Sequence, residues 1–436
     1  GWDKCMKILA DNGFNAVVPN MLWAGRAYYE SKVLPVMPEV GERGDQIAQC
    51  VEAGKKYGVQ VHPWKVNWNL SGAPEEFVER LRAEGRLQMD RDGNEVRWLC
   101  PSNPENFKLE LDSMLEVVRN YDVDGVHFDY IRYPHSNSCY CDGCRRRFEE
   151  SAGVKVANWP ADVIDGEHKD VFAKWRQDQI TRLVKAVSEQ AREIKPHIKI
   201  SAAVFNNWEV HRFAVGQDWK LWIEEGYLDF VCPMDYTESA ESFRSLVTRQ
   251  VEWVDGKVPL YPGIGVTLGR WTLTGAETIQ QAAVARELGA DGFMLFNYSE
   301  HIANEVAPTL HESFTATKSI LPHESPKVAF EFGEGLPDKE TLTFAADEPV
   351  PVSVAVAAEG PFDKKVVRAR GEVYLETVEG RRLQKVGECS SEGQPAKPEL
   401  RLEPGKYRLA LEGTVSFEGG TKQKFLRRSR PFAVSE

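Results

Sequence analysis

Several features are missing from this sequence of 436 residues, and each absence excludes a class of protein. No apolar run reaches the roughly 18 residues that a membrane-spanning helix requires. The 54 Lys and Arg side chains are outnumbered by 66 Asp and Glu, whereas a nucleic-acid-binding protein needs a basic surface to meet phosphates. No glycine-rich phosphate loop follows any predicted strand. We therefore expect no membrane, no nucleic acid and no organic cofactor among the partners of this protein.

A repeating pattern runs from the first residues to about residue 300. In each repeat a helix ends near a glycine, an apolar strand follows at once, and polar or aromatic residues stand at the end of the strand. The predicted strands lie within residues 11–20, 56–64, 121–130, 197–205, 225–236, 258–266 and 288–298. Amphipathic helices are predicted between them, among them Asp45–Lys56, Pro104–Asn120, Val171–Lys195 and Thr274–Leu288.

Alternating strands and helices over this length indicate a parallel sheet covered by helices. Seven strands are visible, and a (β/α)8 barrel of the TIM type has eight. We therefore predict an α/β barrel whose first strand is missing from this sequence or is supplied in some unobvious way. A doubly wound open sheet is the alternative, and the absence of a glycine-rich phosphate loop speaks against it.

The composition changes near Pro322, where helical periodicity gives way to alternating strands such as VPVSVAVAA and KYRLALEG. This pattern predicts a barrel domain over residues 1–322 and a C-terminal all-β sandwich domain over residues 323–436. The sandwich is either a carbohydrate-binding module or a packing domain that supports the barrel. No cluster of exposed aromatic residues is evident in it, which favours the packing domain.

Barrel enzymes carry their active sites at the carboxyl ends of their strands, where this sequence places amides, carboxylates and tryptophans. Such a set suits a sugar, because indole rings stack on the apolar faces of a pyranose while its hydroxyl groups need polar partners. The predicted substrate-binding residues are Asn20, His62, Trp64, Arg132, Tyr133, Asn206, Glu209, Tyr236 and Asn297.

The segment DGVHFDYIRYP (124–134) carries the sharpest local pattern. Asp129 stands where the predicted strand ends, and Arg132 follows in the loop. A carboxylate in this place can act as the nucleophile of a glycosidase or stabilise an oxocarbenium ion. The alternative is an Asp129–Arg132 ion pair that only orders the loop.

This segment, together with CPMDY (232–236) and ADGFMLFNYS (290–299), resembles the glycosyl hydrolase-like family 10 proteins, formerly a domain of unknown function. The resemblance covers about residues 1–310. It implies a TIM-barrel hydrolase of glycosidic bonds in a family whose substrates are poorly defined. The missing first strand departs from the family pattern.

Hydrolysis of a glycosidic bond needs a second carboxyl group that protonates the leaving oxygen. We assign this role to Asp235, because Met234 and Tyr236 beside it would exclude water and raise its pKa, as an acid catalyst requires. The placement resembles retaining α-glycosidase barrels that pair carboxylates on the fourth and sixth strands, and the seventh strand here ends in Gly263-Ile264-Gly265 without an acid. The other candidates are Glu209, Glu238 and Glu300.

Four cysteines have the spacing of a zinc site. Cys139, Cys141 and Cys144 form C-x-C-x2-C after Asp129, and Cys100 lies upstream. Four thiolates from two segments fit a closed tetrahedral zinc site of structural type, and the arrangement is similar to the structural zinc of family 42 β-galactosidases. A disulfide with free thiols is the alternative in an oxidising compartment.

We therefore predict a glycoside hydrolase that uses Asp129 and Asp235 on an oligo- or polysaccharide. The rival is a carbohydrate-binding protein on a barrel that has lost its chemistry. His127 and His135 near Asp129 suggest a metallohydrolase only weakly, since no further ligand pattern accompanies them. The chain begins at Gly1 without an apolar leader, so the sequence does not determine its compartment, although a glycan hydrolase suits an extracellular or periplasmic place.

Overall fold

The computed structural model describes residues 1–316, 320–324, 326, 328–333, 342–346, 348–357, 366–378, 380–418, 420, 422–429 and 431–435. The described chain forms two compact units, residues 1–10 with 16–233 and residues 11–15 with 234–436. These units are defined by compactness rather than by fold class, so the domain boundary near residue 322 stays a prediction.

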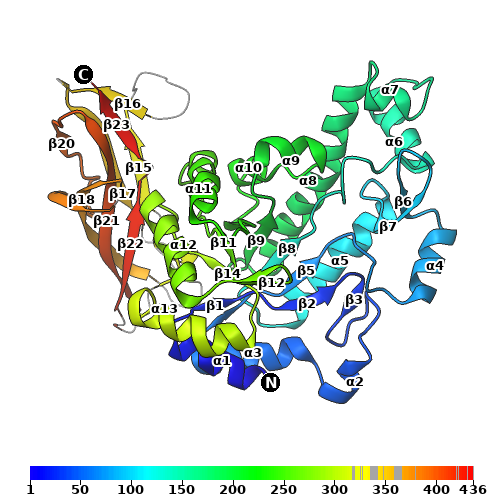
Figure 1. Cartoon of the computed structure of the whole chain (residues 1–436), viewed down its shortest axis with the longest axis horizontal. Coiled ribbons are helices and arrows are strands. Elements are labelled where there is room, and N and C mark those ends of the chain that lie inside the picture. Colours follow the sequence, from blue (N-terminus) through cyan, green and yellow to red (C-terminus); the bar gives the residue numbers. More distant parts are fainter. Residues whose placement is uncertain are drawn as a thin grey trace. The chain divides into compact units, whose positions relative to one another are not determined.

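In the first unit, parallel strands alternate with helices in the order of the chain (Figure 1). Its strands are β1 (Ala16–Val17), β2 (Asn20–Trp23), β3 (Arg26–Ala27), β4 (Gln60–Val61), β5 (Trp64–Val66), β6 (Leu87–Met89), β7 (Glu95–Leu99), β8 (Gly125–Asp129), β9 (Lys199–Val204) and β10 (Phe230–Pro233). Its helices are α1 (Trp2–Asp11), α2 (Glu39–Arg43), α3 (Gln46–Tyr57), α4 (Glu75–Ala83), α5 (Pro104–Asn120), α6 (Asp142–Ala152), α7 (Ala161–Ile164), α8 (Lys169–Ile194), α9 (Trp208–Ala214) and α10 (Trp219–Glu224).

The main sheet of this unit has the strand order β10-β9-β8-β5-β2-β3, in which only β3 runs antiparallel to its neighbour. Strand β8 is buried along its whole length, as expected for a central parallel strand. Its register places Asp129 beside Val66 of β5 and Phe128 beside Ala202 of β9. The carboxyl ends of β5, β8 and β9 therefore lie at one edge of the sheet.

Local sequence explains the helices next to this edge. Asn103 caps α5 by accepting hydrogen bonds from the N–H groups of Glu105 and Asn106, and Pro104 fills the first helical position. The predicted range Pro104–Asn120 is the observed one. Helix α8 packs against α5 beside β8 (Figure 1).

The second unit contains the parallel pair β11 (Gly263–Gly265) and β14 (Met294–Phe296), and a parallel bridge joins Met234 to Gly263. Its other elements before residue 325 are α11 (Ala240–Val254), β12 (Thr267–Leu268), β13 (Trp271–Thr272), α12 (Gly275–Leu288), η1 (Ile302–Val306), α13 (Ala307–Ser313) and η2 (Pro322–Glu324). All seven predicted strand regions thus contain parallel strands, and the sequential βα order is that of the predicted TIM-type barrel. The antiparallel hairpin β6–β7 was not predicted.

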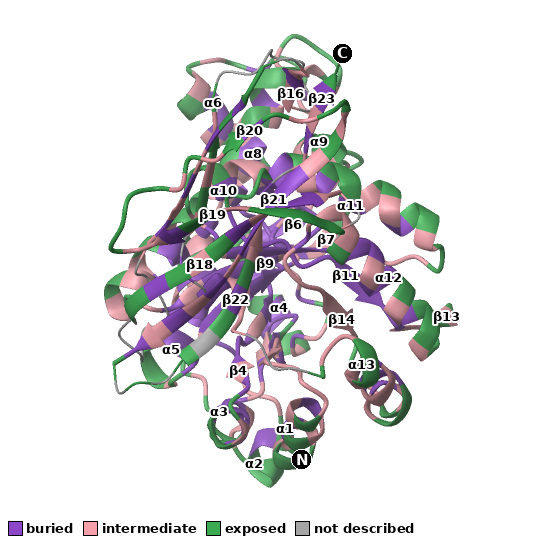
Figure 2. Cartoon of the chain, turned by 90° about the vertical axis from the view of Figure 1, so that its left-hand side faces the viewer, coloured by how far each residue is buried: buried purple, intermediate pink, exposed green. Residues whose placement is uncertain are grey.

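The C-terminal part of this unit is all-β. Its strands are β15 (Val328–Phe332), β16 (Leu342–Ala345), β17 (Val350–Val356), β18 (Val366–Thr377), β19 (Arg382–Ser390), β20 (Glu399–Leu400), β21 (Gly405–Phe417), β22 (Lys422–Arg428) and β23 (Phe432–Ser435). They form one sheet of β15, β17 and β20 and a larger sheet of the other strands, and the buried side chains of both sheets share one core cluster. Figure 2 shows buried and exposed residues alternating along β18, as in a sheet with one covered face. Some ends of the predicted strands, such as Lys327, Thr341 and Ala358, lie outside the described residues.

Candidate active site

Strand β8 ends in a buried carboxyl group at the edge where β5, β8 and β9 end. The Asp129 carbonyl accepts a hydrogen bond of 2.8 Å from the Asn67 N–H, and its Oδ1 accepts one of 2.6 Å from the Tyr130 N–H. Tyr130 adopts φ +52°, a left-handed conformation that costs a non-glycine residue energy. The chain therefore turns sharply at Asp129, and the turn holds the carboxyl group in place.

Burial raises the pKa of Asp129 from its ordinary value of 3.8 to about 7. The Tyr130 N–H, the positive charge of Arg132 and the nearby Trp64 side chain all act in the opposite direction, because they favour the ionised form. Asp129 is therefore a carboxyl group that titrates near neutral pH. Such shifts are concentrated at functional sites, where burial and fixed charges tune a group for proton transfer or attack.

Arg132 lies in a stack of aromatic rings beside Asp129. Its guanidinium carbon lies 4.6 Å from the ring centroid of Phe205, 4.8 Å from that of Tyr130 and 5.4 Å from that of Trp98. We call these four residues the Arg132 stack. Its members come from β7, from the turn after β8 and from the first position after β9, so three separate segments hold one cation in place.

The alternative considered for Asp129, an ion pair with Arg132, is not the arrangement that orders this loop. Within the described chain no N–O contact of 4.0 Å or less joins them, and the Arg132 Nη1 donates instead to the carbonyls of Tyr133, at 2.9 Å, and Pro134, at 3.1 Å. Arg132 thus orders its own loop through backbone carbonyls and rings. Its charge acts on Asp129 from a longer distance.

His62 lies deeper in the sheet than the other predicted rim residues. The register pairs Trp64 with His127, so His62 is level with Gly125, four residues before Asp129 and about 13 Å along the strand. Its ring is fully buried and packs edge-on against Phe230, and burial lowers its pKa to about 3. This depth does not support the predicted contact with substrate.

Tyr133 is also fully buried, below the Arg176 guanidinium, which lies 4.3 Å from its ring centroid. Burial raises its pKa, and the charges of Cys144 and Cys100 raise it further, so the ring lies near the cysteine cluster described below. A substrate-binding role for Tyr133 is not supported by this position.

Of the remaining predicted residues of the first unit, Asn20 and Trp64 begin strands β2 and β5, whereas Asn206 and Glu209 follow strand β9. Asn20 and Trp64 are register partners on β2 and β5, and both are half-buried. Asn206 follows β9 and is half-buried, and Glu209 is exposed in the first turn of α9. The structure therefore brings Trp64 to Asp129 and leaves Glu209 in solvent.

In the second unit, Asp235 follows β10 by two residues and is 0% exposed, compared with 7% for Asp129. Its Oδ1 accepts a hydrogen bond of 2.6 Å from Gln250 Nε2, and its Oδ2 has no partner among the described residues. Burial raises the pKa of Asp235 well above its ordinary value, because it disfavours the charged form. Tyr236 stacks on Phe296 with centroids 5.1 Å apart, and Asn297 is exposed.

A buried ion pair lies next to Asn67, the residue that contacts the Asp129 backbone. Lys65 Nζ and Glu110 Oε1 are 3.3 Å apart with side-chain exposures of 2% and 3%, and Asn67 Nδ2 donates to Glu110 Oε2 at 2.8 Å. Asn67 is the residue whose N–H holds the Asp129 carbonyl. This network therefore fixes the segment that supports Asp129 from the β5 side.

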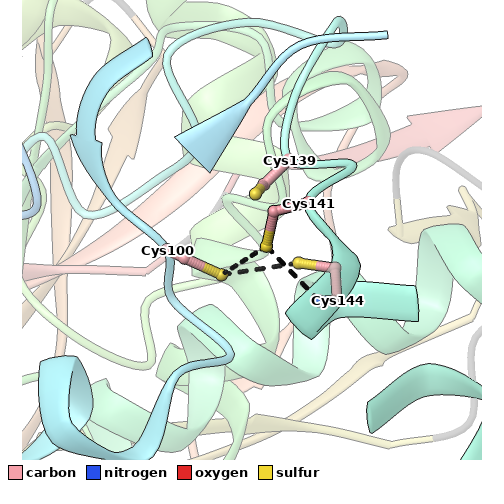
Figure 3. Close-up of side chains that lie close together, drawn as sticks. All are labelled: Cys100, Cys139, Cys141 and Cys144. Carbon is pink, nitrogen blue, oxygen red and sulfur yellow. Dashed lines mark hydrogen bonds between the residues drawn. The ribbon is translucent and has the colours of Figure 1, made fainter. Parts of the chain in front are cut away.

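The four predicted cysteines meet in one buried cluster (Figure 3). All four Sγ atoms lie within 4.8 Å of one another, and no disulfide joins them. The Sγ of Cys100 is 3.4 Å from that of Cys144 and 3.8 Å from that of Cys141. These distances fit a tetrahedral metal, because four sulfur atoms about 2.3 Å from a zinc ion are about 3.8 Å apart.

Sequence reasoning missed Trp98, Phe205 and His211. The rings of Phe205 and His211 stack with centroids 4.3 Å apart at an interplanar angle of 28°. Phe205 is the last residue of the strand region predicted over 197–205, and this position at a strand end was a usable signal. Nothing in the sequence connects Trp98, on an unpredicted hairpin, with Arg132.

Within the described residues, no helix combines the length and the apolar character needed to cross a membrane.

Known proteins resemble this chain in both sequence and fold. The sequence profile of the family described as glycosyl hydrolase-like 10 matches residues 3–271. An S-layer-related protein of Niallia circulans is 23% identical over 63% of this chain, and the glycosyl hydrolase YngK of Bacillus subtilis is 24% identical over 51% of it. The matches span 20% and 46% of the lengths of these two relatives.

Among solved structures, the glycoside hydrolase domain of PgaB (BpsB) from Bordetella bronchiseptica superposes with a TM-score of 0.60 at 14% identity. The superposition covers 73% of this chain and 93% of that domain. At this identity the likeness concerns the fold, and it confirms the predicted barrel of glycoside hydrolase type.

Proposed function

The chain belongs to the glycosyl hydrolase-like 10 family, and from this premise we propose that it hydrolyses glycosidic bonds of an oligo- or polysaccharide with Asp129 as a catalytic carboxylate. The observation that carries the proposal is the buried Asp129 at the end of β8, whose pKa is raised to about 7. The turn at Tyr130 holds this carboxyl group in place, and the charge of Arg132 acts on it. A buried carboxyl group with a raised pKa is typical of a functional site and not of a solvent-exposed surface residue.

Asp129 acts in its ionised form, as the nucleophile or as the stabiliser of the oxocarbenium ion. Arg132 and the Tyr130 N–H favour that form, while burial keeps water from solvating it. The proposed acid is Asp235, because burial raises its pKa and so favours the protonated form that proton donation requires. Its Oδ2, which has no protein partner among the described residues, is the atom to meet a leaving oxygen. Glu209 is the second choice, and its exposure supports it less well.

The test measures release of reducing ends across a broad panel of glycans, with the wild type beside Asp129→Asn. We expect the wild type to release reducing ends from one class of glycan and the variant to lose at least about a thousandfold in kcat, because the transition-state charge loses its partner. Calorimetry with the same glycan is expected to show that the variant still binds.

Asp170→Asn is the matched control, because Asp170 is an exposed aspartate in the first turn of α8. It is expected to keep the wild-type rate. Wild-type turnover by Asp129→Asn would remove Asp129 from the mechanism.

A carbohydrate-binding protein without hydrolysis is the second candidate, and the complete burial of Asp235 is the observation that favours it. Substrate reaches Asp235 only if the surrounding side chains move. This candidate predicts glycan binding by the wild type with no new reducing ends.

We further propose that the cysteine cluster binds one structural zinc ion through Cys100, Cys139, Cys141 and Cys144. The bound ion would crosslink the segment before α5 to the loop between β8 and α6. Four protein ligands leave no position for a reacting water, so the ion serves the fold. Cys141 Sγ already accepts the N–H of Cys144 at 3.4 Å, as a thiolate ligand does.

A further inference from the structure

We propose that His211 accepts a hydrogen bond from one hydroxyl group of the glycan bound beside Asp129 and thereby selects the substrate. This inference rests on the proposed function and extends it to specificity. No sequence pattern marks His211, which lies in the middle of the short helix α9.

The hydrogen bonds of His211 define its tautomer. Its Nδ1 lies 2.7 Å from the carbonyl oxygen of Asn207, and because a carbonyl can only accept, Nδ1 carries the proton. The other nitrogen, Nε2, is then an acceptor in the neutral ring. Nε2 has no partner among the described residues and is not a buried atom.

The surroundings of His211 keep its ring neutral. Burial lowers its pKa, and the positive charge of Arg132 lowers it further, whereas the hydrogen bond to Asn207 acts in the opposite direction. A neutral ring is what an acceptor requires, because a protonated imidazole has no lone pair to offer.

The His211 ring also adjoins the Arg132 stack, which lies beside Asp129. Ala203 of β9 is level with Asp129, since Phe128 pairs with Ala202, and Phe205 follows two residues later on the same side of the sheet edge. The Phe205 ring contacts Arg132 on the one hand and His211 on the other. Arg132 shifts the pKa of both Asp129 and His211, so its charge acts on both sites.

The acceptor is preorganised, which is the condition for selectivity. The ring is clamped between the Asn207 carbonyl and the Phe205 face, and so loses little freedom when a hydroxyl group binds. A substrate lacking that hydroxyl leaves Nε2 without this hydrogen bond. This costs about tenfold or more in kcat/KM.

The experiment uses the full chain and monodeoxy analogues of the glycan that the panel identifies. For the wild type we expect one analogue to lose about tenfold or more in kcat/KM against its parent. His211→Phe keeps a ring against Phe205 but has no acceptor, so it is expected to lose a similar factor on the parent and to treat that analogue and the parent alike. His211→Gln, which restores an acceptor oxygen, is expected to recover part of the discrimination.

His168→Phe is the control, because His168 packs edge-on against Phe148 at the start of α8, away from the Arg132 stack. It is expected to keep the wild-type pattern. Wild-type discrimination in His211→Phe, or an equal loss on every analogue, would overturn the role of His211.

If the wild type releases no reducing ends, the proposed hydrolysis fails, and the same comparison is made with dissociation constants. Binding that discriminates through His211 then supports this inference alone. An absence of glycan binding overturns both.

Discussion

Asp129 occupies an environment that opposes its charge, and three neighbouring groups partly offset that opposition. Burial raises its pKa to about 7, although Tyr130, Arg132 and Trp64 all favour the ionised form. A residue kept in such a place lowers the stability of the folded chain at neutral pH, because the unfolded chain ionises freely. Proteins tolerate this cost where the group has a function.

The loss of folding stability that the buried Asp129 causes depends on pH in a definite way. Between pH 3.8 and about 7, the native Asp129 keeps a proton that the unfolded chain has released, so the free energy of unfolding falls as the pH rises through this window. Asp129→Asn removes the titration. We expect the variant to gain about 3 kcal/mol over the wild type between pH 5 and pH 8, at about 1.4 kcal/mol for each pKa unit.

Urea unfolding at pH 5, 6, 7 and 8 measures this difference. Asp170→Asn should show none, because Asp170 is exposed. A difference for Asp129→Asn that does not vary with pH would mean that Asp129 is already ionised in the folded protein near pH 5.

At the scale of elements, one connection links the proposed catalytic group to most of the proposed metal site. The segment between β8 and α6 begins after Asp129, contributes Arg132 to the stack and includes Cys139 and Cys141, and Cys144 follows in the first turn of α6. Arg176 of α8 donates to the Ser138 carbonyl and lies over Tyr133, so the middle of the segment is also held. The cysteine cluster thus anchors the far end of the loop that positions Arg132.

The number of zinc ions bound per chain can be measured directly. We expect about one zinc ion per purified chain by elemental analysis, and a fall in the midpoint of thermal unfolding of about 5 °C or more in Cys141→Ser, because structural zinc contributes folding free energy. Cys389→Ser is the control, since Cys389 is a buried thiol of the all-β region outside the cluster. Metal-free wild-type protein with unchanged thermal stability would contradict the assignment.

At the scale of the whole molecule, charged side chains join the all-β region to helix α12 and to the residues that follow it. Arg427 of β22 and Asp291, just after α12, form an ion pair of 2.7 Å with side-chain exposures of 13% and 15%. Arg408 of β21 donates to the carbonyl of Glu287 at the end of α12 at 2.7 Å. These contacts favour the packing role proposed for this region over a carbohydrate-binding module.

Arg427→Met tests this fastening. We expect a loss of about 1–3 kcal/mol in the free energy of unfolding, because Asp291 is left largely buried without its partner. Arg401→Met is the matched control, since Arg401 and its partner Glu399 are 65% and 73% exposed, and it should change stability by less than about 0.5 kcal/mol. Equal effects of the two substitutions would show that the link adds no stability.

The barrel pattern and the cysteine cluster could be predicted from the sequence because their signals are local. A buried parallel strand needs an apolar run, and its helix needs a periodic face and a cap, as Asn103 and Pro104 show for α5. The spacing of Cys139, Cys141 and Cys144 brings three thiols together within residues 139–144. Asp129 followed from the same logic, as the polar residue at a strand end.

Only the tertiary structure showed how deep each predicted site residue lies and in which direction the loop after β8 runs. His62 and Tyr133 stand beside strand ends in the sequence, yet the register lowers His62 into the interior and the loop turns Tyr133 under Arg176. The Arg132 stack joins residues up to 107 positions apart, from Trp98 to Phe205. The periodicity of a sequence indicates which face of a segment is buried. It does not indicate which side chains of a distant segment will contact that face. Periodicity and spacing therefore indicated the fold class and Asp129 as a candidate catalytic residue. Contacts between distant segments decided which side chains surround Asp129.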